Sequence, residues 1–262
     1  MIIIKTKEEV EKIRQSGKML ADILKQVSRE VKPGVTTGYL EEKACSLIKE
    51  AGARPAFKGY KSDNEAIAFP TALCTSINNE IVHAPALPAR ELRTGDIIGI
   101  DVGIEYPSNS GSGGYYTDMA ITLPVGKISQ QAQKLIRTTK ESLDLAIQQV
   151  KPNNSLYDIG KAIQEFVENK GFSVVRDLVG HGVGQAIHED PQIPNYKTEA
   201  AKKITLKPGM VIAIEPMVNI GNWQIKISDD NLSILTFDGS LSAHFEHTIA
   251  VTEDGCEVLT KI

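Results

Sequence analysis

Two patterns of apolar residues alternate along the chain and predict its helices and strands. Apolar positions recur at helical spacing over residues 7–30 and 129–150. Residues 96–105, 115–125 and 210–218 have the composition of strands. Because helices gathered against mostly antiparallel strands form an α+β domain, we expect that fold class.

The chain repeats itself. Val31-Lys32-Pro33 precedes an amphipathic helical pattern, and Val150-Lys151-Pro152 precedes a similar one. The stretch 92–101, which ends in Asp101, is echoed by 206–215, which ends in Glu215. Internal repeats decide architecture before any local pattern does, so the two halves are expected to be structurally related.

The repeat predicts one domain, residues 1–262, built from two pseudo-symmetric halves of roughly 7–125 and 129–260. Ligand sites are commonly built where two such units meet. We therefore expect a cleft at the junction of the halves.

Composition narrows the classes of function. Hydrophobic residues make up 41% of the chain and charged residues 24%, as in ordinary globular proteins. The net charge of −4 argues against nucleic-acid recognition, because binding phosphates needs clustered Lys and Arg. The three cysteines are widely separated and predict neither a disulfide framework nor a zinc ribbon. Only Met1 to Ile4 precede Lys5, which is too short for a signal sequence, so we expect a cytoplasmic protein with no membrane partner.

Two aspartates flank a predicted hairpin turn. Residues 107–114 are rich in Gly and Ser and separate the strand that holds Asp101 from the strand that holds Asp118. In a regular antiparallel pair, residues equally far from the turn centre face each other, about 5 Å apart. We expect Asp101 and Asp118 to lie directly across from each other.

The second half repeats this arrangement with Glu215 and Glu246, whose midpoint falls within residues 228–231. Four ionised carboxylates a few Å apart would repel one another by roughly 4 kcal/mol per close pair at an effective dielectric near 20. Two divalent cations would balance the four charges. Carboxylates with a neutral imidazole suit a dinuclear Mn, Fe, Co or Zn site.

His181 is the natural nitrogen ligand, because the glycines on either side of it let backbone and solvent approach closely. Simpler interpretations exist for single residues. An acid in a strand is more often at an edge or in a salt bridge. Cys74 alone is most simply a small core residue, His83 alone is a satisfied loop histidine, and His244 and His247 are strand positions beside the metal site.

Together these residues resemble the motifs of the type I methionine aminopeptidases, which have the pita-bread fold. The matching motifs run in order over nearly the whole chain: Asp101, Asp118, Gly180–Gly184, His188–Pro191, Ile214–Met217 and Ser242–Thr248. The resemblance implies that Asp101, Asp118, His181, Glu215 and Glu246 bind two metal ions, with Asp118 and Glu246 bridging. The 30 residues between Glu215 and Glu246 leave no room for the helical insert of type II enzymes.

The resemblance also implies catalytic and substrate-binding roles. Glu215 would accept a proton from the attacking water, His188 would hydrogen-bond the scissile carbonyl, and His83 would contact the substrate beyond the cleaved bond. Tyr60, Phe69 and Cys74 occupy positions expected around the methionine side chain. The implied activity is removal of the initiator methionine from nascent polypeptides, preferably before a small residue.

Several residues depart from the family pattern. The loops 61–68 and 107–114 are longer than usual, and Ala84 replaces a glycine. Ile187 and Leu232 stand where aromatic residues are common. These departures bear on how strictly methionine is preferred.

Two alternatives stay open: a Xaa-Pro aminopeptidase on the same fold, and a non-catalytic pita-bread protein that binds peptides or ribosomes. The first usually carries a large N-terminal domain, and the second typically loses metal ligands. The expected partner is a peptide or nascent-chain N-terminus, with contact to the ribosome an open possibility, and the family implies a monomer.

Overall fold

The structure, a computed structural model, describes residues 1–61, 67–108 and 113–261. Both predicted helical stretches are confirmed, and each is followed by a second helix. Thr6 begins the first helix with a capping box, in which its side chain accepts from the Glu9 N–H and the Glu9 carboxylate accepts from the Thr6 N–H. The helices are α1 (Lys7–Ser28), α2 (Thr37–Glu50), α3 (Gln130–Ile147), α4 (Leu156–Asn169) and the 3₁₀ helix η1 (Glu199–Lys203).

The strands of the described residues pair antiparallel in four sheets. The first sheet holds β1 (Arg54–Pro55), β2 (Leu73–Ile77), β4 (Ile97–Tyr106) and β5 (Tyr115–Pro124). The largest holds β7 (Gly180–Gly182), β8 (Glu189–Ile193), β9 (Val211–Ile214), β14 (His247–Val251) and β15 (Cys256–Val258). The remaining two hold β6 (Ser173–Val174), β10 (Met217–Asn219) and β13 (Ser242–His244), and β3 (Glu80–Val82), β11 (Ile225–Ile227) and β12 (Ile234–Thr236).

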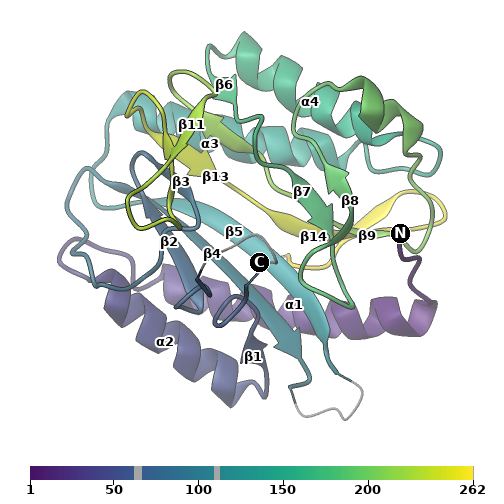
Figure 1. Ribbon diagram of the computed structural model, residues 1–262, viewed down its shortest axis with the longest axis horizontal. Coiled ribbons are helices and arrows are strands. Elements are labelled where there is room, and N and C mark those ends of the chain that lie inside the picture. The colour runs from purple at the N-terminus through teal and green to yellow at the C-terminus, as the bar shows by residue number, and fades with distance from the viewer. Residues whose placement is uncertain (62–66, 109–112, 262) are drawn as a thin grey trace.

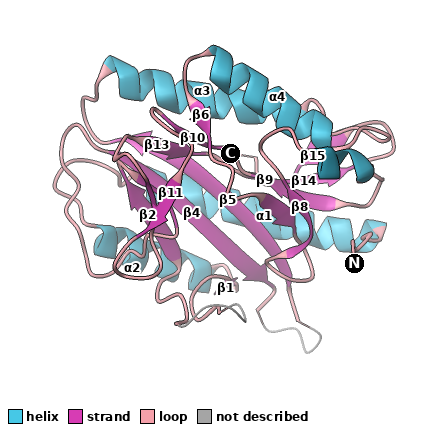
Figure 2. Ribbon diagram, turned by 45° about the horizontal axis from the view of Figure 1, so that its top comes forward, coloured by secondary structure: helices cyan, strands magenta, loops and turns pink. Residues whose placement is uncertain are grey.

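The helices lie outside the strands, with α1 and α2 on one side and α3 and α4 on the other (Figures 1 and 2). Each helix pair covers its own hydrophobic core. Leu20 and Leu40 from α1 and α2 pack with Ile100 of β4, while Leu135 and Ile163 from α3 and α4 belong to the second core. The strands between these cores are thereby held in fixed positions.

Equivalent loops of the two halves make equivalent contacts. The Leu92 N–H donates to the Val35 carbonyl at 2.8 Å, and the Leu206 N–H donates to the Asn154 carbonyl at 2.8 Å. Isolated bridges follow in both places, Thr36 with Glu91 and Ser155 with Thr205. The sequence repeat thus corresponds to repeated backbone contacts.

The expectation that Asp101 and Asp118 face each other directly is wrong. Asp101 pairs with Ala120, and Asp118 pairs with Gly103, so the two aspartates are diagonal neighbours on one face of the sheet. The turn residues 109–112, on which that expectation rested, lie outside the described residues. The offset belongs to the whole β4–β5 ladder, which runs in one register from the pair Ile97–Pro124 to the pair Tyr106–Tyr115.

The strand expected over residues 210–218 is broken in two at Glu215 and Pro216. Pro216 has no N–H to donate, which favours a break in the ladder. The facing strands β13 and β14 break at the same level, between His244 and His247. The pairings on both sides share one register centred between Asp230 and Asn231, as the midpoint predicted. Glu215 and Glu246 therefore lie opposite each other at a matched kink.

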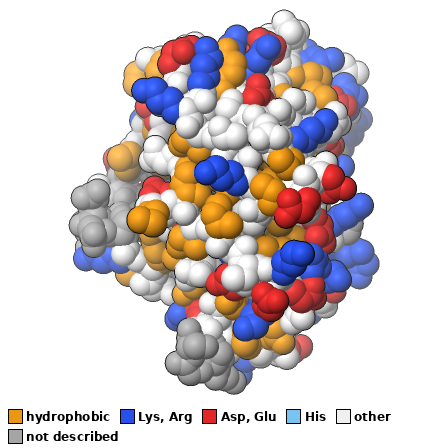
Figure 3. Space-filling view, turned by 90° about the vertical axis from the view of Figure 1, so that its right-hand side faces the viewer, with side chains coloured by type: hydrophobic (Ala, Val, Ile, Leu, Met, Phe, Trp, Pro, Cys, Tyr) orange, Lys and Arg blue, Asp and Glu red, His pale blue; other side chains and the backbone are white. Residues whose placement is uncertain are grey.

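No helix among the described residues is long and apolar enough to cross a membrane. On the face seen from the right of Figure 1, Lys and Arg side chains are mixed with Asp and Glu side chains around apolar patches (Figure 3).

Candidate metal centre

One cavity, with a volume of about 930 Å³, lies where the two halves meet. Every residue to which the sequence assigned a function lines it. From the first half come Tyr60, Phe69, Cys74, His83, Asp101 and Asp118, and from the second come His181, His188, Glu215 and Glu246. The structure therefore brings together side chains as far apart in the chain as Tyr60 and Glu246.

Three ligand atoms at the base of the cavity form a compact group. One atom each from Asp118, His181 and Glu246 lie within 4.8 Å of one another, a spacing that suits one bound metal ion. His181 Nε2 is also 3.6 Å from Glu215 Oε1 and 3.8 Å from Asp118 Oδ2. Ligand atoms that bind the same metal ion lie at such distances from one another, with the ion between them.

The carboxylates are buried in a way that disfavours their charges. Burial raises the pKa of Asp118 to about 7. Burial and then the charge of Asp118 raise the pKa of Asp101, and the same two causes raise those of Glu215 and Glu246. Asp101 Oδ1 and Glu246 Oε1 are buried and have no hydrogen-bond partner among the described residues. Divalent cations would supply both the missing partners and the missing positive charge, so the residues fit metal ions.

A backbone contact sets which nitrogen of His181 can bind a metal. Nδ1 lies 2.9 Å from the Gly182 carbonyl, which can only accept, so Nδ1 carries the proton. Nε2 then presents its lone pair to Asp118 and Glu215. Burial lowers the pKa of His181 to about 4, which keeps the ring neutral and able to coordinate a metal.

The glycines around His181 allow the close approach of neighbouring backbone. A Cβ on Gly180 would lie 2.3 Å from the Ala213 carbonyl oxygen, and one on Gly182 would lie 2.2 Å from that of Asp190. These oxygens belong to β9 and β8, the strands on either side of β7. The expected close approach of backbone at these glycines is confirmed, and the packing of β7 between β8 and β9 is what requires it.

His188 and Tyr60 meet on one wall of the cavity. The Tyr60 hydroxyl is 2.9 Å from His188 Nδ1, and the ring of His188 stands edge-on to that of His181 with centroids 4.6 Å apart. Desolvation, followed by the neighbouring histidines His181 and His83, lowers the pKa of His188. With a neutral ring and the hydroxyl donating to Nδ1, Nε2 carries the proton and can donate it.

An apolar cluster extends the cavity beyond these polar groups. Phe57, Cys74 and Ile187 pack together, with Tyr60 and Phe69 against them. Ile187 is only 4% exposed and does not line the cavity, so it acts by supporting Phe57 and Cys74. Leu232, by contrast, does line the cavity. Loop residues 62–66, part of the departure at 61–68, lie outside the described residues.

His83 enters the cavity from the loop that follows β3. Its backbone has a φ of 58°, in the left-handed region that few residues other than glycine adopt. The Thr75 N–H donates to the Ala84 carbonyl at 2.7 Å, and Cys74 pairs with Pro85, so β2 holds this loop in place. The unusual φ is thus imposed by a fixed loop at the cavity edge.

From the sequence, His244 is most simply a strand position beside the metal site, and the structure places it next to Glu215. It is 3% exposed, and its Nε2 lies 3.7 Å from Glu215 Oε2. Its place two residues before Glu246 is visible in the sequence, but β13 ends at His244 and β14 begins at His247, so the two side chains do not share one strand.

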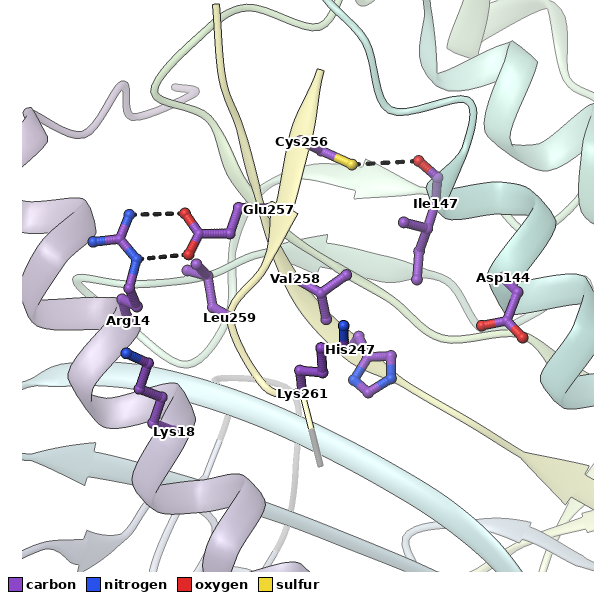
Figure 4. A pocket seen from close by; sticks show the side chains of 10 residues that line it. All are labelled: Arg14, Lys18, Asp144, Ile147, His247, Cys256, Glu257, Val258, Leu259 and Lys261. Atoms are coloured by element: carbon purple, nitrogen blue, oxygen red, sulfur yellow. Dashed lines mark hydrogen bonds and ion pairs between the residues drawn. The ribbon is translucent and has the colours of Figure 1, made fainter. Parts of the chain in front are cut away.

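A second depression, of about 820 Å³, lies on another part of the surface, between α1, α3 and β15 (Figure 4). Arg14 binds both carboxylate oxygens of Glu257 there, at 2.7 and 2.8 Å. His247 lines this depression, and its Nδ1 lies 3.1 Å from Thr260 Oγ1. Among the described residues, the one group of three or more His, Cys, Asp and Glu suited to a metal is in the larger cavity.

Comparison with known proteins agrees with this geometry. The family described as metallopeptidase family M24 matches residues 11–253. The chain is 46% identical over 263 residues to methionine aminopeptidase 1 of Bacillus subtilis, and the match covers 100% of both. The structure of a methionine aminopeptidase from Thermotoga maritima matches with a TM-score of 0.92 and 43% identity, covering 100% of both chains. A prolidase from Pyrococcus horikoshii shares the fold alone, with a TM-score of 0.75 and 21% identity, and the match covers 64% of that chain. These neighbours confirm the expected α+β pita-bread fold.

Proposed function

We propose, because this chain belongs to metallopeptidase family M24 and matches methionine aminopeptidases over its whole length, that it removes the N-terminal methionine from nascent polypeptides. We expect it to act preferentially when the second residue is small. The observation that carries the proposal is the group of buried acids around His181, two of which have an oxygen with no hydrogen-bond partner in the part of the chain that the structure describes.

We assign five metal ligands: Asp101, Asp118, His181, Glu215 and Glu246. Two divalent ions would balance the four carboxylate charges, with Asp118 and Glu246 bridging. The compact group of Asp118, His181 and Glu246 supports a shared position for these three, and the raised pKa of each acid supports a need for positive charge. The donor set suits Mn, Fe, Co or Zn, so metal availability decides the identity.

The metal ions, when bound, polarise the substrate carbonyl and lower the pKa of water. The residues of the chain do the rest. Glu215 accepts the proton of the attacking water, because its carboxylate faces the centre of the group through Oε1. His188 donates from Nε2 to the carbonyl oxygen as negative charge develops there, since the Tyr60 hydroxyl occupies Nδ1. His83, at the cavity edge, contacts the substrate beyond the cleaved bond.

Tyr60, Phe69 and Cys74 form the contact surface for the methionine side chain. They line the cavity beside the metal centre and pack with Phe57. A flexible thioether fits such an apolar, aromatic wall well, because sulfur makes favourable contacts with aromatic rings.

We also propose how the protein is organised. The chain acts as a single domain of two related halves, 7–125 and 129–260, which the equivalent contacts of Leu92 and Leu206 support. All three cysteines are free thiols, in keeping with a cytoplasmic monomer that meets nascent chains.

The test compares wild type with Asp118→Asn on the peptide Met-Ala-Ser in Mn²⁺ or Co²⁺. We expect wild type to release methionine and the variant to lose at least 100-fold in kcat/KM. Asp144→Asn, a similar change in the second depression, is the matched control and should be fully active. Wild type that stays inactive with two metals bound, verified by elemental analysis, would refute the proposal.

Substrate preference is tested on a panel of peptides that begin with Met or Leu, or that have Pro in second position. We expect Met before Ala to be cleaved fastest. Faster release of Leu would rule out methionine specificity. Preference for peptides with Pro in second position would instead point to the Xaa-Pro aminopeptidase alternative.

A further inference from the structure

The buried imidazole of His244 has an unmet hydrogen-bonding atom that faces the metal centre. Its Nε2 has no hydrogen-bond partner among the described residues, and its nearest carboxylate atom is Glu215 Oε2 at 3.7 Å. Burying a polar atom without a partner is destabilising, so such atoms rarely persist without a function.

The backbone of His244 is fixed on two sides. Thr122 Oγ1 accepts from the His244 N–H at 2.9 Å and donates to the His244 carbonyl at 2.8 Å. On the other side, His244 pairs with Met217 of β10, two residues beyond Glu215. The ring therefore has a set position relative to the Glu215 carboxylate.

The two oxygens of Glu215 face two different imidazoles. Oε1 lies 3.6 Å from His181 Nε2, and Oε2 lies 3.7 Å from His244 Nε2. His181 presents a lone pair because its proton is on Nδ1. A neutral His244 with its proton on Nε2 would instead be a donor, and Oε2 would be its acceptor.

We propose that His244 is a positioning residue that donates a hydrogen bond from Nε2 to Glu215 Oε2 and fixes the carboxylate while Oε1 serves the metal centre. This rests on the proposed function. To form this hydrogen bond, Nε2 and Oε2 must approach each other by roughly 0.7 Å, which a small rotation of the carboxylate supplies. Partners that orient a metal-binding carboxylate typically change metal affinity or activity 10- to 100-fold when removed.

The test compares His244→Leu, which removes the donor at similar volume, with His244→Gln, whose side-chain amide keeps one. His247→Gln is the matched control, because this neighbouring histidine bonds Thr260 instead. The readouts are the Kd for Mn²⁺ of each metal-free protein, by calorimetry, and kcat and KM for Met-Ala-Ser.

We expect His244→Leu to weaken Mn²⁺ binding and lower kcat by about 10- to 100-fold, with KM changed less than about threefold. His244→Gln and His247→Gln should stay within about threefold of wild type. Wild-type Kd and kcat in His244→Leu would overturn the proposal. An equal loss in His244→Gln would also overturn it, because that result would show that the imidazole itself is a metal ligand.

Should His244→Leu fail to fold, nitrogen-15 NMR of wild type decides the question. A proton on His244 Nε2 in the metal-loaded protein supports the proposal, and a proton on Nδ1 alone refutes it. The calorimetry and NMR do not depend on which peptide is cleaved. An inactive wild type would therefore refute the proposed function and leave these readouts to judge His244.

Discussion

Thr248 holds both backbone groups of Asp118 with a single hydroxyl. The Asp118 N–H donates to Thr248 Oγ1 at 3.0 Å, and that hydroxyl donates to the Asp118 carbonyl at 2.8 Å. Nearby, the Glu246 N–H donates to the Ala120 carbonyl at 2.9 Å. The first half of the chain is thereby joined to the second at the residues that meet in the metal cavity.

Removing this hydroxyl should affect both stability and metal binding. Thr248→Val keeps the shape but leaves a buried N–H and a buried carbonyl unpaired, so we expect a loss of roughly 2 to 4 kcal/mol in the free energy of unfolding. Urea denaturation measures it, and Mn²⁺ titration should show weaker binding. Thr248→Ser retains the hydroxyl and should behave like wild type. A Val variant as stable as wild type would show that the link between the halves lies elsewhere.

The pH dependence of the metal-free protein should differ between wild type and Asp118→Asn. The folded pKa of Asp118, about 7, lies above its ordinary value of 3.8. Below about pH 4 both states are protonated, and Asp118 has no effect on stability. As pH rises toward 7 the unfolded state loses its proton first, so wild type is progressively destabilised.

The Asn variant does not titrate, and it also relieves the charge on the neighbouring acids. Metal-free Asp118→Asn should therefore gain stability relative to wild type between pH 4 and 7, by the order of 4 kcal/mol. Thermal unfolding across that range measures the difference. Adding Mn²⁺ at pH 7 should reverse the order, because the variant loses a ligand. A difference that does not vary with pH would contradict the burial of a charged Asp118.

A buried ion pair supports the loop that carries His188. Lys5 Nζ contacts the Glu189 carboxylate, and the side chains are only 1% and 4% exposed. Glu189 also accepts from the Gln185 and Ala186 N–H groups, so it shapes the turn before His188. Lys5→Met leaves the carboxylate buried without its positively charged partner. We expect the free energy of unfolding to fall by roughly 3 to 5 kcal/mol.

The matched control is the exposed pair Lys202–Glu199, where Lys202→Met should be much less destabilising than Lys5→Met. Urea denaturation of both variants gives the comparison. Equal effects would mean that burial of the Lys5 pair does not matter. Adding Glu189→Gln to Lys5→Met should recover part of the loss, since the unpaired charge is then gone.

The Tyr60 hydroxyl should be needed for turnover more than for binding. Tyr60→Phe removes the contact with His188 Nδ1 at 2.9 Å and leaves the proton of His188 free to move from Nε2 to Nδ1. We expect kcat for Met-Ala-Ser to fall about 10-fold, with KM within about threefold because the aromatic wall remains. Steady-state kinetics measures both. An unchanged kcat would mean that Tyr60 does not set the tautomer of His188.

Residue order alone predicted the helices α1 and α3, the internal repeat and the side chains that meet in the cavity. Apolar spacing predicted α1 and α3, and the midpoint of Glu215 and Glu246 predicted a register that the strands on both sides share. The midpoint rule gave the register correctly for Glu215 and Glu246 and wrongly for Asp101 and Asp118. The period of the apolar pattern is a local property, so it can be read from residue order. The same is true of residue type, which is why acids in apolar strands indicated a metal site.

The positions of these side chains relative to one another became visible only in the folded chain. The tertiary structure placed Asp101 and Asp118 diagonally, explained Gly180 and Gly182 by neighbouring strands, and turned His244 toward Glu215. Each of these depends on atoms far away in the chain, such as the Ala213 and Asp190 carbonyls. Distances between separate strands are set by packing, which residue order alone does not specify.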